Sequence, residues 1–159
     1  MEAKYFPIQI EEKWSKVWAD RELAKPESEN FFSQIIPPPN VTGTLHMGHS
    51  FQYAIMDFYT RYHHMNGTDA YWQVGTDHAG IATQMVVENN LRNEGKTKDD
   101  LGREPFVDEV WKWKDYSEGK ITSQMKRLGI TVEWDKYRFT LDDDSYQGVI
   151  KAVVDLYRH

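Results

Sequence analysis

Residues 37–49 read PPPNVTGTLHMGH, and this stretch decides how the sequence around it is interpreted. Three prolines, two glycines and two histidines do not fit the interior of an ordinary helix or strand. A short apolar run, Phe31 to Ile36, comes before the stretch, and apolar residues at helical spacing follow it from about His46 to Asn66. The stretch is therefore predicted to form the turn from a buried strand into a helix.

The alternation of strand and helix continues after this turn. Residues 71–74 are predicted to form a second strand, and a further helix is expected from about Ile81 to Glu94. The order strand, helix, strand, helix predicts parallel strands joined by a right-handed crossover. We therefore expect an α/β fold: the first half of a doubly wound parallel-sheet, Rossmann-like nucleotide-binding domain.

The segments on either side of this unit have helical patterns. An N-terminal amphipathic helix is expected over residues 8–24, and residues 99–158 are expected to be mostly helical, with a break at Gly119. The predicted organisation of residues 1–159 is thus an N-terminal helix, a βαβα nucleotide-binding unit over residues 31–95 and a helical C-terminal part.

Composition and charge narrow the class of protein. The chain has 159 residues, of which 40% are hydrophobic, a formal net charge of −6 and no cysteine. A chain of this size can bury a core, while the negative charge argues against broad unaided binding to nucleic acid and the lack of cysteine excludes thiolate chemistry. No apolar run is long enough to cross a bilayer, and the first residues do not resemble a signal or transit peptide. A cytoplasmic protein that does not bind membranes is expected.

The turn predicted at residues 37–49 lies where open α/β sheets bind ligands. Free N–H groups at the start of the next helix favour phosphate oxygens, and glycine lets a ligand approach the backbone closely. His46 and His49 are three residues apart, so both imidazoles are expected on one side of the first helical turn, where they can donate to a phosphate. A zinc site that uses the two imidazoles and a purely structural helix start are the alternatives.

Residues 37–49 resemble the His-x-Gly-His signature region of the class I aminoacyl-tRNA synthetases, and within that family they are similar to the valine-specific members. Further similarities to the valine-specific members cover nearly the whole chain and occur at residues 75–84, 102–104, 111–113 and 138–140. The second signature of the family, Lys-Met-Ser-Lys-Ser, does not occur in this sequence. The chain therefore resembles an N-terminal fragment of the catalytic domain.

This resemblance implies a ligase that activates valine with ATP, forming valyl-adenylate, and then transfers valine to tRNA(Val). Mg²⁺ would be carried by ATP, no protein-bound metal is implied, and tRNA would bind mainly through regions absent from this chain. The catalytic residues would be His46 and His49, which would hold the phosphates and stabilise the transition state. ATP binding would involve Gly43, Thr44, His46, Gly48 and His49. Valine binding would involve Pro38, Asn40 and Asp77, with the Asp77 carboxylate pairing with the α-ammonium group.

Several residues near these motifs have plainer interpretations. Asp77 could cap the helix that is expected to begin near Ile81. The histidines His63, His64 and His78 are expected to be structural or solvated. Packing roles are expected for Trp72 and Trp111.

Two alternative functions stay open for the chain as a whole. One is a small nucleotidyl transferase that uses the His-x-Gly-His motif alone, without a further partner. The other is an isolated fragment that only binds ATP or valine weakly. Activity or binding of the chain by itself would distinguish these alternatives from the ligase.

Overall fold

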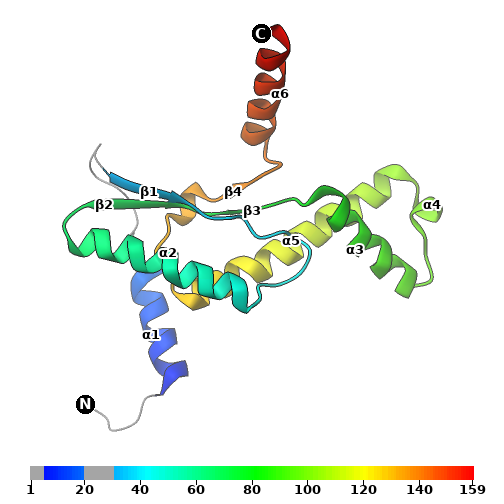
Figure 1. The fold of residues 1–159 in the computed structure, drawn as a ribbon. Helices are drawn as coiled ribbons and strands as arrows, with labels where there is room; N and C mark the ends of the chain where they lie inside the picture. The colour runs from blue at the N-terminus through cyan, green and yellow to red at the C-terminus, as the bar shows by residue number, and fades with distance from the viewer. Residues whose placement is uncertain (1–5, 20–30) are drawn as a thin grey trace. The chain divides into compact units, whose positions relative to one another are not determined.

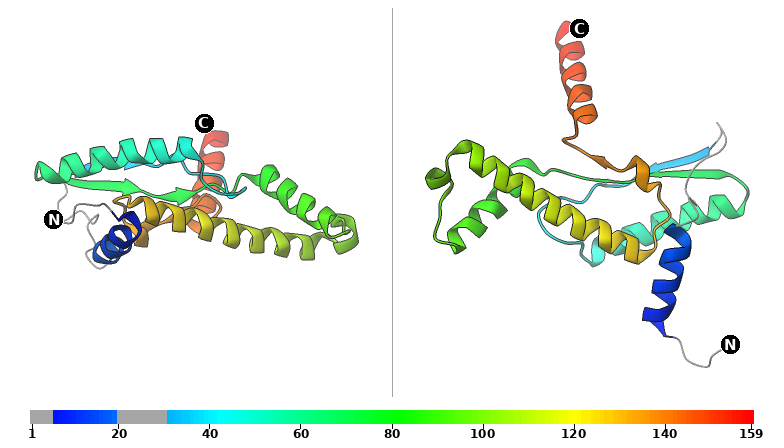
Figure 2. Two further views of the ribbon diagram at one scale, coloured as in Figure 1. Left: turned by 90° about the horizontal axis from the view of Figure 1, so that it is seen from below. Right: turned by 180° about the vertical axis from the view of Figure 1, so that it is seen from behind.

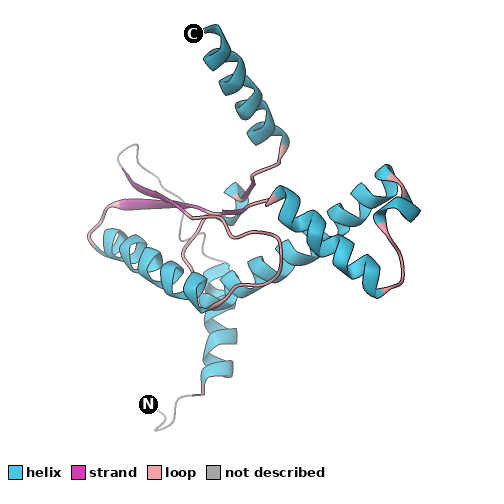
Figure 3. Ribbon diagram, turned by 45° about the vertical axis from the view of Figure 1, so that its right-hand side comes forward, coloured by secondary structure: helices cyan, strands magenta, loops and turns pink. Residues whose placement is uncertain are grey.

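The computed structural model describes residues 6–19 and 31–159 (Figure 1). Helix predominates among them, and the strands are short (Figure 3). In chain order the elements are α1 (Pro7–Ala19), β1 (Phe31–Ile35), α2 (Met47–Met65), β2 (Asp69–Gln73), β3 (Gly75–Thr76), α3 (Gly80–Asn93), α4 (Lys98–Leu101), α5 (Arg103–Leu128), the 3-10 helix η1 (Trp134–Lys136), β4 (Arg138–Phe139) and α6 (Asp143–Arg158). Residues 20–24, the predicted end of the first helix, lie outside the described residues.

The chain divides into two compact units, and each unit is made of separate stretches of sequence. The first unit comprises Met1–Ile36, His46–Val74 and Thr122–Tyr137. The second comprises Pro37–Leu45, Gly75–Ile121 and Arg138–His159. The predicted turn of residues 37–49 is therefore divided between them, with its histidines in the first unit. Each unit is described by itself.

The first unit contains the predicted strand, helix and strand. β1 and β2 pair in parallel, with Phe31 opposite Asp69 and Ile35 opposite Gln73. The helix that joins them, α2, lies alongside the strand pair (Figure 1). Parallel strands cannot be joined by a tight turn, so a connecting helix of this length is what their pairing requires. The prediction of a parallel αβ arrangement is confirmed.

Aromatic side chains of α2 and β2 form the core of the first unit. Tyr53 and Trp72 are fully buried, and their rings meet edge to face with centroids 6.3 Å apart. Burial raises the pKa of Tyr53 to about 12. Next to this core, the Gln34 amide donates to the Met56 carbonyl at 2.7 Å and to the Thr60 hydroxyl at 2.6 Å. The predicted packing role of Trp72 is confirmed.

The second unit has a helical core. α3 and the first part of α5 lie side by side and are joined through α4 (Figure 2). Their buried contact consists of Val87, Leu91 and Phe106, and the partly buried residues packed against it are Leu101, Val110 and Trp113. α5 continues through Gly119 without a break, so the predicted interruption there is wrong. A glycine inside a helix costs only about 1 kcal/mol relative to alanine, which packing on both sides of it outweighs.

A short parallel strand pair was not predicted from the sequence and belongs to the second unit. Gly75 of β3 pairs with Arg138 of β4, and Thr76 pairs with Phe139. The pairing depends on glycine, because a Cβ atom at position 75 would overlap the Arg138 carbonyl oxygen and lie 3.2 Å from its carbonyl carbon. β3 and β4 thus bring residues from the middle and the end of the sequence next to each other.

The last helix, α6, exposes apolar side chains. It contains no buried residue, and its exposed apolar residues include Val149, Val153 and Tyr157. Across residues 6–19 and 31–159, no helix combines the length and the apolar character needed to cross a membrane.

Candidate functional site

His46 and His49 form a reciprocal cap at the start of α2. The backbone at His46 is extended, with φ −118° and ψ 173°, so this residue ends the preceding loop and begins the helix. The Gly48 N–H donates to Nδ1 of His46 at 3.1 Å, and the His46 N–H donates to Nδ1 of His49 at 3.2 Å. The two imidazole rings are stacked, with centroids 3.8 Å apart. Both rings therefore lie together at the first helical turn, as their spacing predicted.

These hydrogen bonds fix which nitrogen of each ring carries the proton. Because Nδ1 of both rings accepts a backbone N–H, a neutral imidazole must carry its hydrogen on Nε2. Burial, and then the nearby His46, lower the pKa of His49 below its usual value of 6.5. His49 is thus neutral at pH 7 and has an Nε2–H that its cap does not use. An N–H donor of this kind suits a phosphate oxygen.

Two aromatic residues, Tyr53 and Trp72, connect the histidine pair to the core of the first unit. The His49 ring is followed at 6.0 Å by the Tyr53 ring, which in turn contacts the buried Trp72. Tyr53 is one helical turn after His49, so its spacing is the sequence signal for this support. The side chain of His49 is held between the exposed His46 ring on one side and the core on the other.

The absence of a side chain at Gly48 leaves room for the His46 ring. A Cβ atom at position 48 would lie 2.9 Å from Cε1 and 3.0 Å from Nδ1 of His46. These distances are shorter than ordinary van der Waals contacts, so a larger residue would displace the ring that accepts the Gly48 N–H. Glycine at this position therefore preserves the histidine cap.

In the second unit, Asn40 lies beside Asp77. The Asp77 N–H donates to the Pro39 carbonyl at 2.9 Å, and the Val41 N–H donates to the Asp77 carbonyl at 2.9 Å. These bonds form a parallel bridge between Asn40 and Asp77. The backbone of Asp77 is consequently fixed through both its N–H and its C=O, and the exposed Pro38 and Asn40 lie in the extended segment next to it.

Two side chains of α5 hold the turn that contains Gly43. The Trp113 indole N–H donates to the Val41 carbonyl at 2.9 Å, and the Ser117 hydroxyl donates to the Gly43 carbonyl at 2.8 Å. Ser117 is buried, so its hydroxyl is satisfied by this backbone group within the protein. The sequence pattern did not identify either contact, because the partners are more than 70 residues apart in the chain.

The Asp77 carboxylate accepts two hydrogen bonds through the same oxygen. Its Oδ1 accepts from the Ala79 N–H at 3.1 Å and from the Thr140 hydroxyl at 3.0 Å. The N-cap of α3 is Ala79, which has a left-handed backbone at φ 51°, and no side chain caps this helix. Asp77 therefore closes the turn before α3 and is not the N-cap residue of the helix. Strained backbone of this kind is common near ligand sites.

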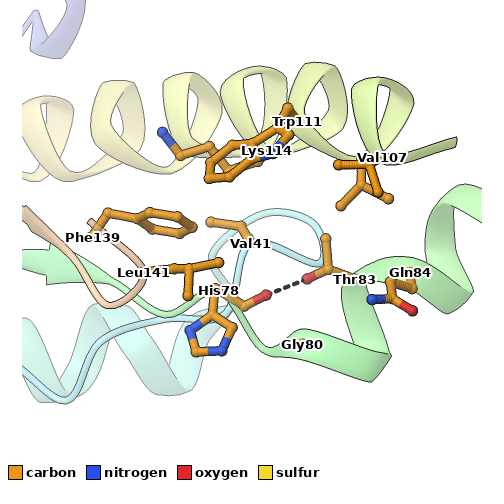
Figure 4. Close-up of a pocket in the computed structure, with 11 residues that line it drawn as sticks. Val41, His78, Gly80, Thr83, Gln84, Val107, Trp111, Lys114, Phe139 and Leu141 are labelled. Carbon is orange, nitrogen blue, oxygen red and sulfur yellow. Dashed lines mark hydrogen bonds between the residues drawn. The ribbon is translucent and has the colours of Figure 1, made fainter. Parts of the chain in front are cut away.

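An apolar cavity of about 170 Å³ lies in the second unit (Figure 4). α5 contributes Val107, Trp111 and Lys114 to its wall, and Phe139 and Leu141 come from the chain after β4. The Lys114 ammonium group lies 4.6 Å from the Phe139 ring centroid and forms an ion pair with Glu118 at 2.7 Å. The Lys114 charge is thus satisfied within the wall. Trp111 is partly exposed here and does not lie in the buried core.

The predicted site residues belong to both units. His46, Gly48 and His49 come together in the first unit, whereas the second unit holds Pro38, Asn40, Gly43, Thr44 and Asp77. Two further histidines make structural contacts, because His63 stacks on Phe32 and His64 contacts the Ala70 carbonyl. Among the described residues, no three His, Cys, Asp or Glu side chains gather in a way that could hold a metal ion.

Comparison with known families and proteins gives consistent results. The family model "tRNA synthetases class I (I, L, M and V)" matches residues 9–159. A valine--tRNA ligase of Acinetobacter baylyi (strain ATCC 33305 / BD413 / ADP1) is 51% identical over 154 residues. That alignment covers 96% of this chain and 16% of the relative. The chain is therefore similar to a small part of that much longer protein.

A solved structure has the same fold over a similarly small part of its length. It is the crystal structure of the ternary complex of Agrobacterium radiobacter K84 agnB2 LeuRS-tRNA-LeuAMS. The match has a TM-score of 0.75 at 22% sequence identity, and it covers 98% of this chain and 18% of the other. At this identity, the likeness establishes the α/β fold of the chain.

Proposed function

Because the chain belongs to the family of class I tRNA synthetases, we propose that it is the N-terminal part, residues 1–159, of the catalytic domain of a valine-tRNA ligase. In this proposal α1 is the N-terminal helix, residues 31–95 form the nucleotide-binding unit and residues 99–158 a mostly helical part. The ligase would activate valine with ATP to give valyl-adenylate and would then transfer valine to tRNA(Val). The observation that carries the proposal is the bridge between Asn40 and Asp77.

Valine would be bound mainly by the second unit. The Asp77 carboxylate has one oxygen engaged by the protein and a second oxygen without a hydrogen-bond partner among the described residues. An ammonium group has three donors and needs such an acceptor. Pro38 and Asn40, in the segment that the isolated bridge joins to Asp77, would border the valine side chain. The rigid backbone of Asp77 supports this role, since a bound ammonium then loses little to reorganisation.

ATP would be bound by the turn and by the start of α2, through Gly43, Thr44, His46, Gly48 and His49. In the reaction a valine carboxylate oxygen attacks the α-phosphorus, the bond to the β-phosphate oxygen breaks, and pyrophosphate leaves. The Nε2–H groups of His46 and His49 would donate to phosphate oxygens as negative charge develops on them. Mg²⁺ would arrive with ATP as part of the substrate. Neither histidine would act as a nucleophile in this scheme.

The partner tRNA(Val) would bind mainly through parts of the ligase outside these 159 residues. The negative net charge of the chain agrees with this, because a surface that binds nucleic acid unaided is usually basic. The cytoplasm as the place of action stays a prediction from the sequence.

The Asp77→Asn variant tests the proposal in the full-length ligase. The amide keeps the size of the carboxylate but loses its charge, so valine binding should weaken by roughly 1.5 to 3 kcal/mol, the range for a hydrogen bond to a charged group. We expect valine-dependent exchange of pyrophosphate into ATP with a raised KM for valine and a nearly unchanged KM for ATP. The double variant His46→Ala/His49→Ala serves as the reference for loss of nucleotide chemistry.

The same exchange assay separates the alternatives. Exchange that does not need valine would support a small nucleotidyl transferase and contradict the ligase. Equal losses for valine and ATP in Asp77→Asn would mean that this carboxylate only holds the turn before α3.

A further inference from the structure

Thr140 lies next to Asp77 because β4 pairs with β3. The Thr140 N–H donates to the Thr76 carbonyl at 3.1 Å, which extends the strand pairing by one residue beyond Phe139. On the opposite edge, the Asp77 N–H donates to the Pro39 carbonyl and the Asp77 carbonyl accepts from the Val41 N–H, which places Asn40 opposite Asp77. Asp77 is therefore flanked by Asn40 on one side and by Thr140 on the other.

The Thr140 hydroxyl is the centre of a small hydrogen-bond network. Its Oγ1 lies 3.0 Å from Asp77 Oδ1, and it accepts the His78 backbone N–H at 2.9 Å. The same oxygen lies 2.7 Å from Nδ1 of the His78 ring. A hydroxyl has one hydrogen and two acceptor positions, so three neighbours use its whole capacity.

The number of donors and acceptors around Thr140 Oγ1 determines the direction of these hydrogen bonds. The backbone N–H of His78 can only donate, and an ionised carboxylate can only accept. The hydroxyl hydrogen must therefore point to Asp77, and the third neighbour, His78 Nδ1, must donate its own hydrogen to the remaining lone pair. If the hydroxyl hydrogen pointed to His78 Nδ1 instead, Thr140 Oγ1 and Asp77 Oδ1 would face each other at 3.0 Å with no hydrogen between them.

This network fixes the orientation of the Asp77 carboxylate. Oδ1 accepts from Thr140 and from the Ala79 N–H, whereas Oδ2 has no partner among residues 6–19 and 31–159. The Asp77 side chain is 37% exposed, so a ligand can reach this carboxylate. We propose that Thr140 is a positioning residue, which turns the Asp77 carboxylate so that Oδ2 faces the valine ammonium group. This inference rests on the proposed function of Asp77.

The three side chains do not form a hydrolytic triad, although Thr, His and Asp occur together in such sites. In a triad the hydroxyl and the carboxylate contact different ring nitrogens of the histidine. Here Thr140 and Asp77 both approach Nδ1 of His78, at 2.7 and 3.4 Å. The histidine cannot then accept the hydroxyl proton while the carboxylate orients it. The geometry consequently points to positioning of Asp77 and not to nucleophilic chemistry by Thr140.

The test compares Thr140→Val with Thr140→Ser in the full-length ligase. Valine has the shape of threonine but lacks the hydroxyl, while serine keeps it. In pyrophosphate exchange, we expect Thr140→Val to raise the KM for valine by about tenfold, the effect of one hydrogen bond to a charged group, with the KM for ATP within twofold of wild type. Thr140→Ser should restore the KM for valine to within about threefold. Thr131→Val is the matched control, because the Thr131 hydroxyl makes no hydrogen bond among the described residues.

A ligand without the ammonium group distinguishes positioning from a general structural effect. 3-Methylbutanoate has the side chain and carboxylate of valine but no amine, so its inhibition constant should be the same in wild type and Thr140→Val. Equal weakening of valine and 3-methylbutanoate, an unchanged KM for valine in Thr140→Val, or failure of serine to rescue would each overturn the inference. A wild-type protein without valine-dependent exchange would instead overturn the proposed function itself.

Discussion

Replacement of Gly75 by alanine is expected to disturb the pairing of β3 with β4. The new Cβ atom would overlap the Arg138 carbonyl oxygen and lie 3.2 Å from the carbonyl carbon and 3.6 Å from Cα of the same residue. All three of these atoms belong to the backbone, so no flexible side chain can move aside. The backbone conformation of Gly75 itself is open to alanine, since its φ is not in the left-handed region. Overlap with β4 is therefore the single cause of the effect.

The size of the effect follows from the contacts that β4 would lose. Restoring an ordinary contact distance requires β4 to move away by about 1 Å, which exceeds what the 3.1 Å bond from the Thr140 N–H to the Thr76 carbonyl can absorb. Loss of one or two hydrogen bonds at about 1 kcal/mol each, together with overpacking of about 1 to 3 kcal/mol, gives a total of about 2 to 5 kcal/mol. The hydroxyl of Thr140 would move away from Asp77 at the same time.

Urea unfolding followed by circular dichroism measures the free energy of unfolding. Gly119→Ala is a matched control, because it introduces the same methyl group into α5 at a position where a Cβ atom meets nothing within 4 Å. It should stabilise the protein by up to about 1 kcal/mol through helix propensity. The reasoning is refuted if Gly75→Ala unfolds at the same urea concentration as wild type, or if it leaves the KM for valine unchanged despite a loss of stability.

Two further predictions concern the start of α2. Because the folded-state pKa of His49 lies below its value in the unfolded chain, the unfolded chain takes up the proton first as the pH falls. The stability contributed by the neutral ring should be complete above pH 6.5 and decrease below it. Thermal unfolding at several pH values should therefore show a melting temperature that depends less on pH in His49→Gln than in wild type. Identical pH profiles for the two proteins would contradict this. Gly48→Ala should raise the KM for ATP more than that for valine, since the methyl group would displace the His46 ring; a more stable variant with a normal KM for ATP would show that the ring has room.

The elements that sequence patterns predicted are encoded by residues close together in the chain. α2 repeats apolar residues over several turns, so its periodicity identifies it as a helix. β1 and β2 are short runs that prolines or turn residues bound, and these bounding residues identify them as strands. β3 and β4 contain only two residues each, which is too few for any periodicity. Their existence depends on a partner far away in the sequence, and this information is not present in either segment alone.

The same difference between local and distant contacts applies to the candidate site. The placement of His46 and His49 on one side of the first helical turn could be predicted from their spacing, whereas the stacking of their rings required the structure. The role proposed for Asp77 came from family resemblance, since no local pattern connects it with Asn40. Thr140 was recognised only as part of a motif, Arg138 to Thr140, and its contact with Asp77 required the structure.

The distance between Asp77 and Thr140 along the chain has a consequence for protein synthesis. These residues are 63 positions apart, so a ribosome that adds 5 to 20 residues per second delivers Thr140 roughly 3 to 13 seconds after Asp77. During that interval one edge of β3 is unpaired, and chaperones or neighbouring chains can bind to this edge. We expect the Asn40 pairing to form first and the carboxylate to acquire its final orientation only when β4 emerges. Pulsed hydrogen exchange on arrested nascent chains should then find the Asp77 amide protected before the Thr140 amide.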